Sequence, residues 1–474
     1  MTVVAGVGGV VALVIAYRRQ RDLEQSRFVE RFGAAAAQLG ATDVAVRIAG
    51  VYAMAGVADE SDGLRRQQCI DVLCGYLRLP YDAEHGASGR TKFVVKAPRV
   101  EHGRVRGETE EHIEYRQNDR EVRATIVRVI ADHLRSEAEY SWSTSNFDFR
   151  TAHLENVDFS RATFSGATRF DNTTFTGTAI FVEATFTGDA EFSRATFTSS
   201  AEFDRATFTR EAGFGSVTFT SYARFGSATF ARDAKFDLAI FTGDAKFVSA
   251  KFAGHARFDE ATFTGHARFD EVIFTGDARF VEAIFIGEAW FGRAKFTSNA
   301  RFGSATFTSD ARFGGVTFSR EAGFGSVTFT SYARFGRATF TRDARFVGAT
   351  FTGDARFVGA TFTGDARFDE AIFTGDARFD EAIFTSNAGF YEVTFTGNAR
   401  FDKSTFTSKA TFANVSFESW ASFRAADFGS GRVVFRTPRQ WGPPPPQFDW
   451  ADDGDRKPSN IEPADWPPAV VAVS

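Results

Sequence analysis

Phenylalanine recurs along residues 159–428 at alternating intervals of five and six positions, beginning Phe159, Phe164, Phe170 and ending at Phe428. This window holds 50 of the 57 Phe in the chain, and a small residue, usually Ala, stands two positions before almost every one. An amphipathic helix needs apolar residues three and four positions apart, which this spacing does not provide. The order Ala-x-Phe instead predicts a short strand that points Ala and Phe inward, followed by two corner residues.

The repeating unit is eleven residues long, and a clean copy, ATFTGDARFDE, begins at Ala360. Self-similarity at a fixed period predicts a stack of repeats rather than one globular core. The segment REAGFGSVTFTSYARFG begins at Arg210 and again at Arg320, an offset of ten such units. With two units in each coil, that offset equals five whole coils, so a duplication of this length keeps every side of the stack in phase.

These units resemble the pentapeptide-repeat family, whose motif is a small residue, any residue, a central Leu or Phe, and two more. The resemblance implies a mainly β fold, a right-handed quadrilateral β-helix with four pentapeptide-like units per coil. The centres from Phe149 to Phe428, with Leu154 among them, then make about 13 coils in a rod roughly 60 Å long at about 4.8 Å per coil. Ala and Phe fill the lumen, so no ligand cavity is expected inside it.

The residues from Val3 to Tyr17 are uncharged and mostly apolar, and Arg18, Arg19 and Arg21 follow. As a helix this run spans about 23 Å, short of the roughly 30 Å hydrocarbon core of a bilayer. A Tyr and a basic cluster at its end are typical of the cytoplasmic membrane interface. We therefore predict that residues 1–21 form an N-terminal transmembrane anchor and its basic flank. The protein would be a single-pass protein of the cell membrane with the bulk of the chain cytoplasmic.

Two alternatives to this anchor stay open: a start codon that truncates a longer hydrophobic hairpin, and an apolar helix packed on the next domain. Small residues at Gly8, Ala12 and Ala16 would permit pairing of helices in the membrane, which leaves a homodimer open.

Residues 22–140 predict a small α-helical region with four helices. The first carries an apolar stripe that ends at Gly40, and the second and third run from Val44 to Ala58 and from about Gly63 to Leu79. The fourth has apolar residues every four positions, at Val122, Ile126, Ile130 and Leu134. Residues 81–117 are densely charged and contain Gly, which predicts an exposed loop. Cys69 and Cys74 are too few for a disulfide framework, and we expect them to be small core residues.

This helical region also resembles the one that precedes the repeats in membrane-anchored actinobacterial proteins of the pentapeptide-repeat family. The stretches that carry the resemblance are CIDVLCGYLRLPY and EVRATIVRVIADHL. The resemblance implies a position in the chain and no activity. We place the β-helix at residues 145–435, where Trp420 and Phe435 would cap the last coil. A Pro-rich, extended or disordered tail is expected at residues 436–474.

Outward-facing residues fall on four walls, because centres two repeat units apart stack and centres one repeat unit apart lie opposite each other. Two opposite walls carry Thr-Phe-Thr triplets, as at Thr174 and Thr196 on one and Thr185 and Thr207 on the other. The other two walls are charged, and one holds a nearly continuous basic column that we take as a candidate interaction wall. The residues of this column are Arg224, Lys246, Arg268, Trp290, Arg312, Arg334, Arg356, Arg378 and Arg400.

Both kinds of wall have a structural and a functional interpretation. The basic column, which runs beside acidic residues from Asp244 to Asp376, is either an ion-pair ladder or a docking face for a polyanion or an acidic protein. The Thr walls reflect the preference of Thr for exposed strands, or they order water and bind ice.

No catalytic, cofactor-binding or metal site is predicted. His255 and His266 lie one repeat unit apart, on opposite sides of the rod. Carboxylate pairs such as Asp369-Glu370 and Asp380-Glu381 are expected at the exposed ends of repeat units. We therefore expect a non-enzymatic, rigid scaffold for protein–protein interaction, with an unknown protein partner and no cofactor.

The alternative is a regulator that mimics DNA and binds DNA gyrase or another topoisomerase, as some members of the family do through a strongly acidic surface. Residues 151–428 hold 33 acidic and 29 basic residues, which is close to neutral. The chain as a whole has a formal net charge of -5. This balance disfavours DNA mimicry, and it predicts no direct binding of nucleic acid.

Overall fold

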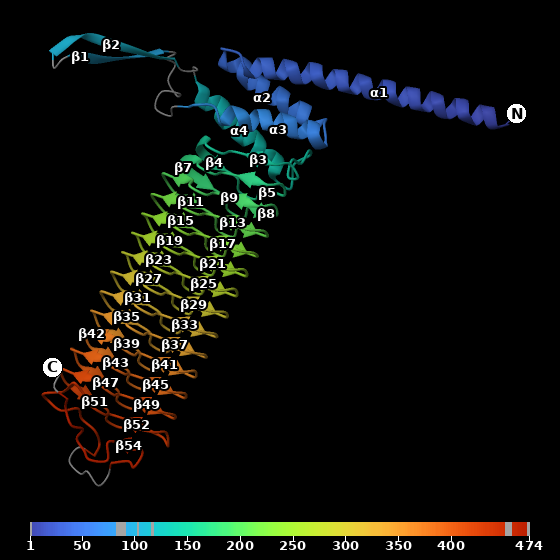
Figure 1. Cartoon of the computed structure of the whole chain (residues 1–474). Helices are drawn as coiled ribbons and strands as arrows, with labels where there is room; N and C mark the ends of the chain where they lie inside the picture. The colour runs from blue at the N-terminus through green and yellow to red at the C-terminus, as the bar shows by residue number, and fades with distance from the viewer. Residues whose placement is uncertain (1, 82–91, 102–103, 115–117, 451–456, 472–474) are drawn as a thin grey trace.

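The computed structural model describes residues 2–81, 92–101, 104–114, 118–450 and 457–471. The chain forms a helical head, a two-stranded hairpin that projects from the head, and a long solenoid of stacked coils (Figure 1). The N-terminus lies at the free end of a long helix, and the C-terminus lies at the far end of the rod.

The head contains the four predicted helices, α1 (Thr2–Leu39), α2 (Val44–Asp59), α3 (Gly63–Leu77) and α4 (Asp119–Leu134). The side chain of Asp43 caps α2 by accepting a hydrogen bond from the backbone N–H of Ala45 at 2.7 Å. The apolar N-terminal run and the amphipathic stripe that follows it form one continuous helix, α1.

Residues Val3–Tyr17, the predicted membrane anchor, are the first part of α1, and the side chains up to Ala16 lie outside those that the structure describes. Among the described residues, no helix is both long enough and apolar enough to pass through a bilayer.

The prediction of a charged loop at residues 81–117 is wrong for most of the segment. Two antiparallel strands, β1 (Lys92–Glu101) and β2 (Arg104–Glu114), pair with each other from Lys92 opposite Glu114 to Glu101 opposite Arg104. The charges suggested a loop, but the run Phe93–Val95 has the β-branched and aromatic residues that favour strands.

The solenoid is built from strands of two residues that pair in parallel with the strands one coil away. In β31 (Ala311–Arg312), for example, Ala311 pairs with Ala289 of β27 (Ala289–Trp290) and with Ala333 of β35 (Ala333–Arg334). Within the described part of the rod only β4 (His153–Asp158) and β7 (Thr174–Ile180) are longer, and each continues around a corner. The strands thus pair in a register of two repeat units, which confirms the predicted coil.

Four walls surround the lumen. A fifteen-stranded sheet from β3 (Phe147–Asp148) to β54 (Ile461–Glu462) is the second charged wall, and a twelve-stranded sheet from β5 (Thr163–Phe164) to β48 (Thr405–Phe406) is the Thr/Lys wall. Strands such as β10 (Thr196–Phe197) form the Thr/Ile wall, and strands such as β15 (Ala223–Arg224) form the basic wall. Around the coil, charged and Thr-rich walls alternate. This is the parallel β-solenoid of about thirteen coils that the Phe spacing predicts.

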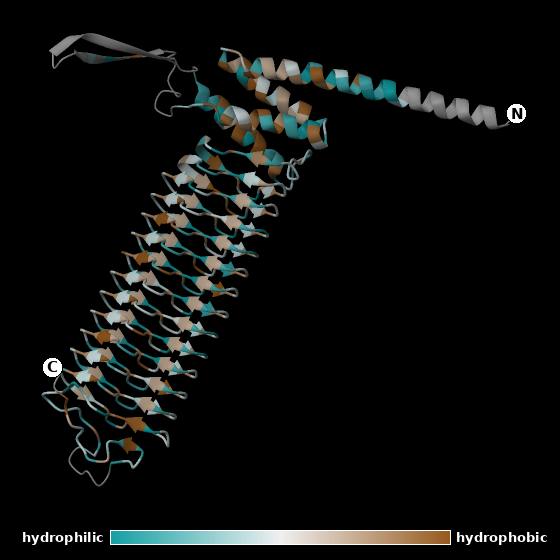
Figure 2. Ribbon diagram, viewed as in Figure 1, coloured by the Kyte–Doolittle hydropathy of each residue, from teal (hydrophilic) through white to brown (hydrophobic). Residues whose placement is uncertain are grey.

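The lumen is filled by Phe and Ala, which are buried along the whole rod. Rings one coil apart lie nearly parallel, as between Phe313 and Phe335, whose centroids are 4.8 Å apart with planes at 2°. Rings from the two charged walls meet edge to face, as between Phe302 and Phe313 at 5.5 Å and 89°. Both arrangements are favourable for aromatic rings and exclude a cavity. In Figure 2, apolar and polar residues accordingly alternate along each coil.

The helical head closes the N-terminal end of the rod, a role that the sequence did not reveal. Trp142 is fully buried beneath it and donates a hydrogen bond from Nε1 to Asp59 at 2.8 Å. Arg78 of the head pairs with Asp148 of the first coil. The first strands are therefore covered rather than left as an open edge.

The C-terminal segment closes the other end. Of the extended or disordered tail predicted after residue 435, the expectation of disorder is wrong for residues 436–450 and 457–471, which pack on the last coils. β53 (Gln440–Trp441) pairs with β50 (Ser416–Phe417), and Phe448 stacks on Phe423 at 4.8 Å. Trp466 covers Phe448 edge to face at 5.1 Å. The Pro run suggested disorder, but aromatic residues spaced around it continue the Phe columns. Phe435 lies in this cap, whereas Trp420 lies outside the lumen, half-buried.

One corner of each repeat unit has a left-handed backbone. The second residue after each Phe of the charged walls, where it is not Gly, has φ between 53° and 60° from Arg161 to Ala425, as at Ser326 with 55°. These residues are mainly Glu, Arg and Ser and include no Val or Ile, and among the described corners of this kind Thr occurs at the two ends of the rod, at Thr151 with φ 61° and Thr437 with φ 50°. Left-handed backbone is unfavourable for β-branched side chains in particular, so the corner selects against them.

We expect Phe313→Ala to lower the free energy of unfolding by about 3–5 kcal/mol, because it opens a cavity in a lumen that cannot collapse around it. Chemical denaturation followed by circular dichroism measures this change. Phe313→Leu should lower the free energy of unfolding by less, because the lumen already accommodates a leucine, Leu154, at one of the central positions of the repeat. The exposed substitution Thr341→Ala is the control. An equal effect of Phe313→Ala and Thr341→Ala would contradict a packed lumen.

We expect Ser326→Val to destabilise the rod by about 1–3 kcal/mol although the side chain is exposed, because Val is strained at positive φ. Ser326→Gly relieves the strain and should change the stability by less than about 1 kcal/mol. Thermal unfolding of the two variants gives the comparison. A stability of Ser326→Val equal to that of the parent chain would show that the corner is not left-handed.

Candidate interaction surface

The nine residues of the predicted interaction wall lie in one column on the basic wall. Their strands run from β15 (Ala223–Arg224) to β47 (Ala399–Arg400), and the residues face their neighbours one coil away in register. Each of the strands places Ala in the lumen and the following residue outside it. The alternation of the strand therefore positions the whole column, and consecutive residues of the column are about 4.8 Å apart by the strand spacing.

The arginines of this column are paired with carboxylates. Nη2 of Arg312 lies 3.0 Å from Glu288 and 3.6 Å from Asp310, and Nη2 of Arg334 also lies 3.6 Å from Asp310. These carboxylates come from the neighbouring corner of the same coil or of the preceding one. The basic wall is therefore a ladder of ion pairs rather than a surface of uncompensated positive charge.

Aromatic side chains are inserted into the ladder where an arginine or a carboxylate is missing. Trp290 lies between two guanidinium groups, with Arg268 at 4.6 Å and Arg312 at 4.7 Å from the ring centroid. The ring of Tyr332 is 5.5 Å from the guanidinium groups of both Arg334 and Arg356. These distances are within the range of cation–π attraction, which fixes the arginines against the wall.

Five arginines follow one another without interruption from Arg312 to Arg400. Between 35% and 42% of each side chain is exposed. In four of them, Arg312, Arg334, Arg356 and Arg400, the Nε atom is buried and has no hydrogen-bond partner among the described residues. The guanidinium groups therefore turn their inner edge to the wall and their outer edge to solvent, where they can donate to a partner.

Asp380 differs from the prediction that the carboxylates at the ends of repeat units are exposed. It is 7% exposed and lies 2.9 Å from Nε of Arg378 and 3.1 Å from Nη2 of Arg400. The long side chain of Arg400, one coil further along, covers it. Asp380 is thus part of the ladder and not a free acid.

The second charged wall is less continuous. Arg279 lies 2.8 Å from Asp259, and Arg345 lies 2.7 Å from Glu321. Glycines at positions 213, 323 and 389 interrupt its column of outward residues. This wall is also neutralised pair by pair, so neither charged wall offers the continuous acidic face that DNA mimicry requires.

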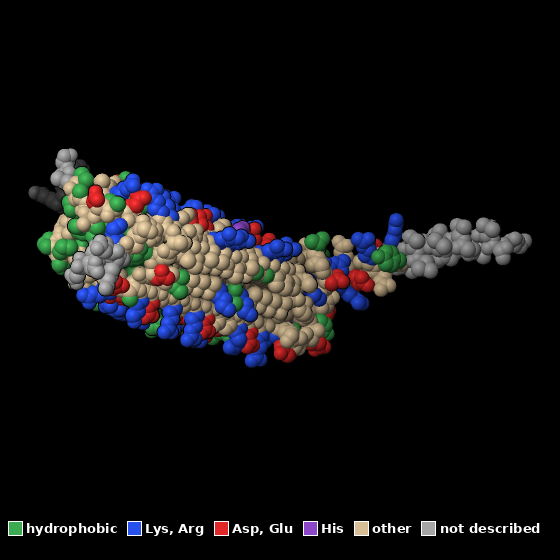
Figure 3. Space-filling model, turned by 90° about the horizontal axis from the view of Figure 1, so that it is seen from below, with side chains coloured by type: hydrophobic (Ala, Val, Ile, Leu, Met, Phe, Trp, Pro, Cys, Tyr) green, Lys and Arg blue, Asp and Glu red, His purple; other side chains and the backbone are tan. Residues whose placement is uncertain are grey.

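The two Thr walls lie opposite each other, as predicted. Thr196 pairs with Thr218 on one wall, and Thr207 pairs with Thr229 on the other. In the face of the rod seen in Figure 3, Lys, Arg, Asp and Glu gather mainly along the edges and are sparse in the middle. The exposed surface of the rod is therefore divided lengthwise into charged and mainly uncharged strips.

Residues that could hold a metal are not brought together. His255 and His266 belong to corners of opposite charged walls, where their backbone N–H groups donate to Asp233 and Asp244. Within residues 2–81, 92–101, 104–114, 118–450 and 457–471, no three His, Cys, Asp or Glu side chains cluster as ligands.

The head has a buried polar network that joins its helices. Asp119 accepts from Arg47 at 2.7 Å, from Tyr76 at 2.5 Å and from Arg123 at 2.9 Å. The three donors come from α2, α3 and α4, so the network fixes the packing of the cap. Burial raises the pKa of the Cys74 thiol to about 12, which keeps this cysteine protonated and unreactive, as expected of a core residue.

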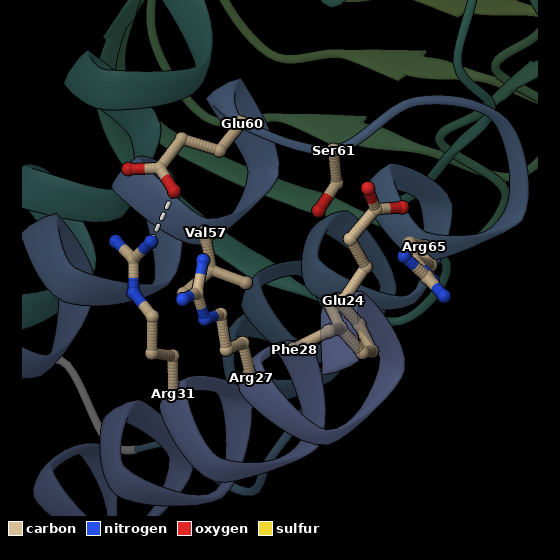
Figure 4. A pocket seen from close by; sticks show the side chains of 8 residues that line it. All are labelled: Glu24, Arg27, Phe28, Arg31, Val57, Glu60, Ser61 and Arg65. Atoms are coloured by element: carbon tan, nitrogen blue, oxygen red, sulfur yellow. Dashed lines mark hydrogen bonds and ion pairs between the residues drawn. The ribbon is translucent and has the colours of Figure 1, made fainter. Parts of the chain in front are cut away.

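A shallow groove of about 290 Å³ lies between α1 and the α2–α3 corner (Figure 4). Three arginines line it, but so do Glu24 and Glu60, and Arg31 pairs with Glu60. That pairing lowers the pKa of Glu60, which stays ionised and cancels the charge of Arg31. The groove is mixed in charge and open, and it does not form a defined ligand site.

The fold and its surface define a parallel, four-walled β-solenoid with a filled lumen. The family model of pentapeptide repeats (9 copies) matches the chain at residues 149–196, 192–240, 227–273, 267–306, 280–328, 302–350 and 346–394. Together these matches cover just over half of the 474 residues. The chain therefore belongs to the pentapeptide-repeat family. Searches among curated proteins and among solved structures found no match.

Two features of this surface were missed by sequence reasoning. The aromatic positions Trp290 and Tyr332 are visible in the sequence as breaks in the charged columns, and Arg268 and Arg312 flank Trp290 one coil away on either side. That pattern would have predicted the cation–π sandwich. The burial of Asp380 depends on the direction of a long side chain from the next coil, which no repeat pattern specifies.

Proposed function

We propose that this protein is a non-enzymatic, rigid scaffold that binds a partner protein along its basic wall. The observation that carries the proposal is the composition of the basic column and of the corner residues beside it: partly exposed Arg and Trp and exposed Tyr, with a single Lys at position 246. Arg, Trp and Tyr are enriched at the energetic centres of protein interfaces, and Lys is depleted there. The family membership supports a scaffold rather than an enzyme.

The chemistry of the wall favours a protein over a polyanion as its partner. A polyanion needs a surface with net positive charge, whereas Arg312, Arg334 and Arg356 are each balanced by a carboxylate within 3.6 Å. A protein with its own mixed charges can exchange pairs with such a ladder and pack against the outward edge of Trp290. The aromatic sandwiches hold the guanidinium groups in place before binding, which reduces the entropy lost on association.

The scaffold is further proposed to be attached to the cytoplasmic face of the cell membrane through residues 1–21. The support is the apolar run Val3–Tyr17 followed by Arg18, Arg19 and Arg21. The long helix α1 would then carry the head and the rod away from the bilayer surface, with the basic wall free along the rod.

Charge reversal at Arg334 and Arg356 should abolish capture of the partner. Full-length protein carrying Arg334→Glu and Arg356→Glu would be used to capture proteins from extracts of the native host, with mass spectrometry as readout. We expect a loss of at least tenfold in the captured partner, because the reversed charges repel its carboxylates and separate Tyr332 from its cations.

The matched control reverses Arg345 and Arg367 on the second charged wall. Both pairs of substitutions break partly exposed ion pairs worth about 0–1 kcal/mol each and place a glutamate beside a carboxylate, so thermal unfolding should shift by a small and similar amount in the two variants. Equal capture by the two variants would contradict binding through the basic wall.

Deletion of residues 2–17 should release the protein from membranes. We expect the full chain in the membrane fraction after alkaline washing and the shortened chain in the supernatant, because the deletion removes the only long apolar run of the sequence. Recovery of the full chain in the supernatant would contradict the anchor and leave the basic-wall proposal untouched.

A further inference from the structure

The two Thr-rich walls are not equivalent. On the Thr/Ile wall, eleven successive coils from Thr174 to Thr396 carry only Thr or Ile at the positions on either side of the central Phe. On the opposite Thr/Lys wall, the corresponding column contains Lys251 and Lys295. Lysines on a flat exposed sheet are a common means of preventing association. One wall is therefore protected in this way and the other is not.

Exposed isoleucines are concentrated on the unprotected wall. Ile240, Ile284, Ile286 and Ile372 are 41–45% exposed, whereas the most exposed described isoleucine of the opposite wall, Ile383, is 39% exposed. Ile is more apolar than the Thr that it replaces in the repeat, so each of these positions adds apolar surface to a face without charge. The Thr/Ile wall is therefore the flatter and more apolar of the two uncharged faces, which favours association through it over association through the Thr/Lys wall.

We propose that the Thr/Ile wall is the interface through which a second copy of this chain packs, face to face and antiparallel. A face that meets a copy of itself repeats every charge that it carries, so its freedom from charge over eleven coils suits self-association in particular. This inference goes beyond the proposed function and uses a different wall, so either one can fail without the other.

The proposed register places two of the isoleucines opposite each other. Ile240 and Ile372 lie on the same column, three coils before and three coils after Thr306. A two-fold axis at Thr306, perpendicular to the rod, therefore brings Ile240 of each copy opposite Ile372 of the other. A parallel arrangement lacks this match, because an axis along the rod exchanges the two outward columns.

The carboxylates at the left-handed corner beside this wall do not meet in the antiparallel register. Glu260 of one copy faces Gly348 of the other, and Glu282 faces Ser326. Each of these carboxylates therefore lies against a small, uncharged residue rather than against a like charge.

At the other corner one carboxylate meets an imidazole and others meet like charges. His266 faces Asp354, whose carboxylate can accept a hydrogen bond from the imidazole. Asp244 faces Asp376 at the rim of the contact, where solvent and salt screen the repulsion. Asp310 lies on the axis and faces its own copy, but two arginines of the same chain already neutralise it, at 3.6 Å each.

The size of the face suits a weak dimer. In this register nine coils of the Thr/Ile wall in each copy face each other. At about 4.8 Å per coil they span about 43 Å, and three residues of strand span about 10 Å, so each copy contributes about 430 Å². The total of about 900 Å² is below the roughly 1,200 Å² of stable interfaces and in the range of weak, transient ones. The dimer is therefore expected to dissociate on dilution.

Sedimentation velocity of the full-length chain, kept in solution by a mild detergent, over a range of concentrations tests the interface. We expect a monomer–dimer equilibrium that Thr306→Lys weakens at least tenfold, because the substitution places two lysines against each other on the axis. The matched control is Thr317→Lys on the Thr/Lys wall, which should leave the equilibrium unchanged. A monomer at every concentration, or equal effects of the two lysines, would overturn the proposal.

Cross-linking tests the antiparallel register. Thr306→Cys lies next to the two-fold axis and should be joined to its own copy by a short bismaleimide. Thr196→Cys faces Ser416 of the other copy and should not be joined to itself. Cys69 and Cys74 are buried and do not compete. Self-cross-linking of both introduced cysteines would indicate parallel packing and overturn the register.

Discussion

The structure depends on backbone hydrogen bonds between successive coils. Each coil contains two repeat units of the sequence, so each bond joins residues about two repeat units apart. The backbone N–H of Ala311 donates to the carbonyl of Tyr332 at 2.8 Å, and that of Phe313 donates to the carbonyl of Arg334 at 2.7 Å. The same pairing recurs along the rod, so each coil is bound to the two beside it and to no other. An extra residue within a strand would turn a Phe outward. An extra residue can be taken up only at a corner, as in the C-terminal cap, where Phe435 stacks on Phe412 across 23 residues instead of 22.

A uniform interior carries no information about function. Successive coils fill the lumen with Phe and a small residue, usually Ala and sometimes Val, and the stacked and edge-to-face contacts repeat along the rod. The outward side chains do not have to fit into the packed lumen. Apart from the residue at the left-handed corner, they therefore vary from coil to coil. Specific recognition therefore has to reside on the walls, where a column such as Arg312 to Arg400 presents five guanidinium groups at strand spacing.

Much of this architecture follows from the sequence because the repeat is local and periodic. The Phe spacing predicts the coil, and the coil length assigns each outward residue to its wall, including all nine residues of the basic column. The C-terminal cap could not be predicted in this way, because Trp441, Phe448 and Trp466 are spaced irregularly and depend on the coil beneath them. The head was recognised as four helices, but its role as a cap depends on contacts such as Arg78 with Asp148 across the junction.

The two caps decide how the rod can associate. A solenoid with open ends presents unpaired backbone groups and would add further copies end to end. Here the head covers the first coil, and Trp466 and its neighbours cover the last one. Association is left to the walls, of which the charged ones are neutralised within each copy and one Thr-rich wall carries lysines. The remaining wall is flat and uncharged and carries exposed isoleucines. Because the caps block end-to-end growth, contact between copies of the chain is left to the sides of the rod, and this wall is the side best suited to it.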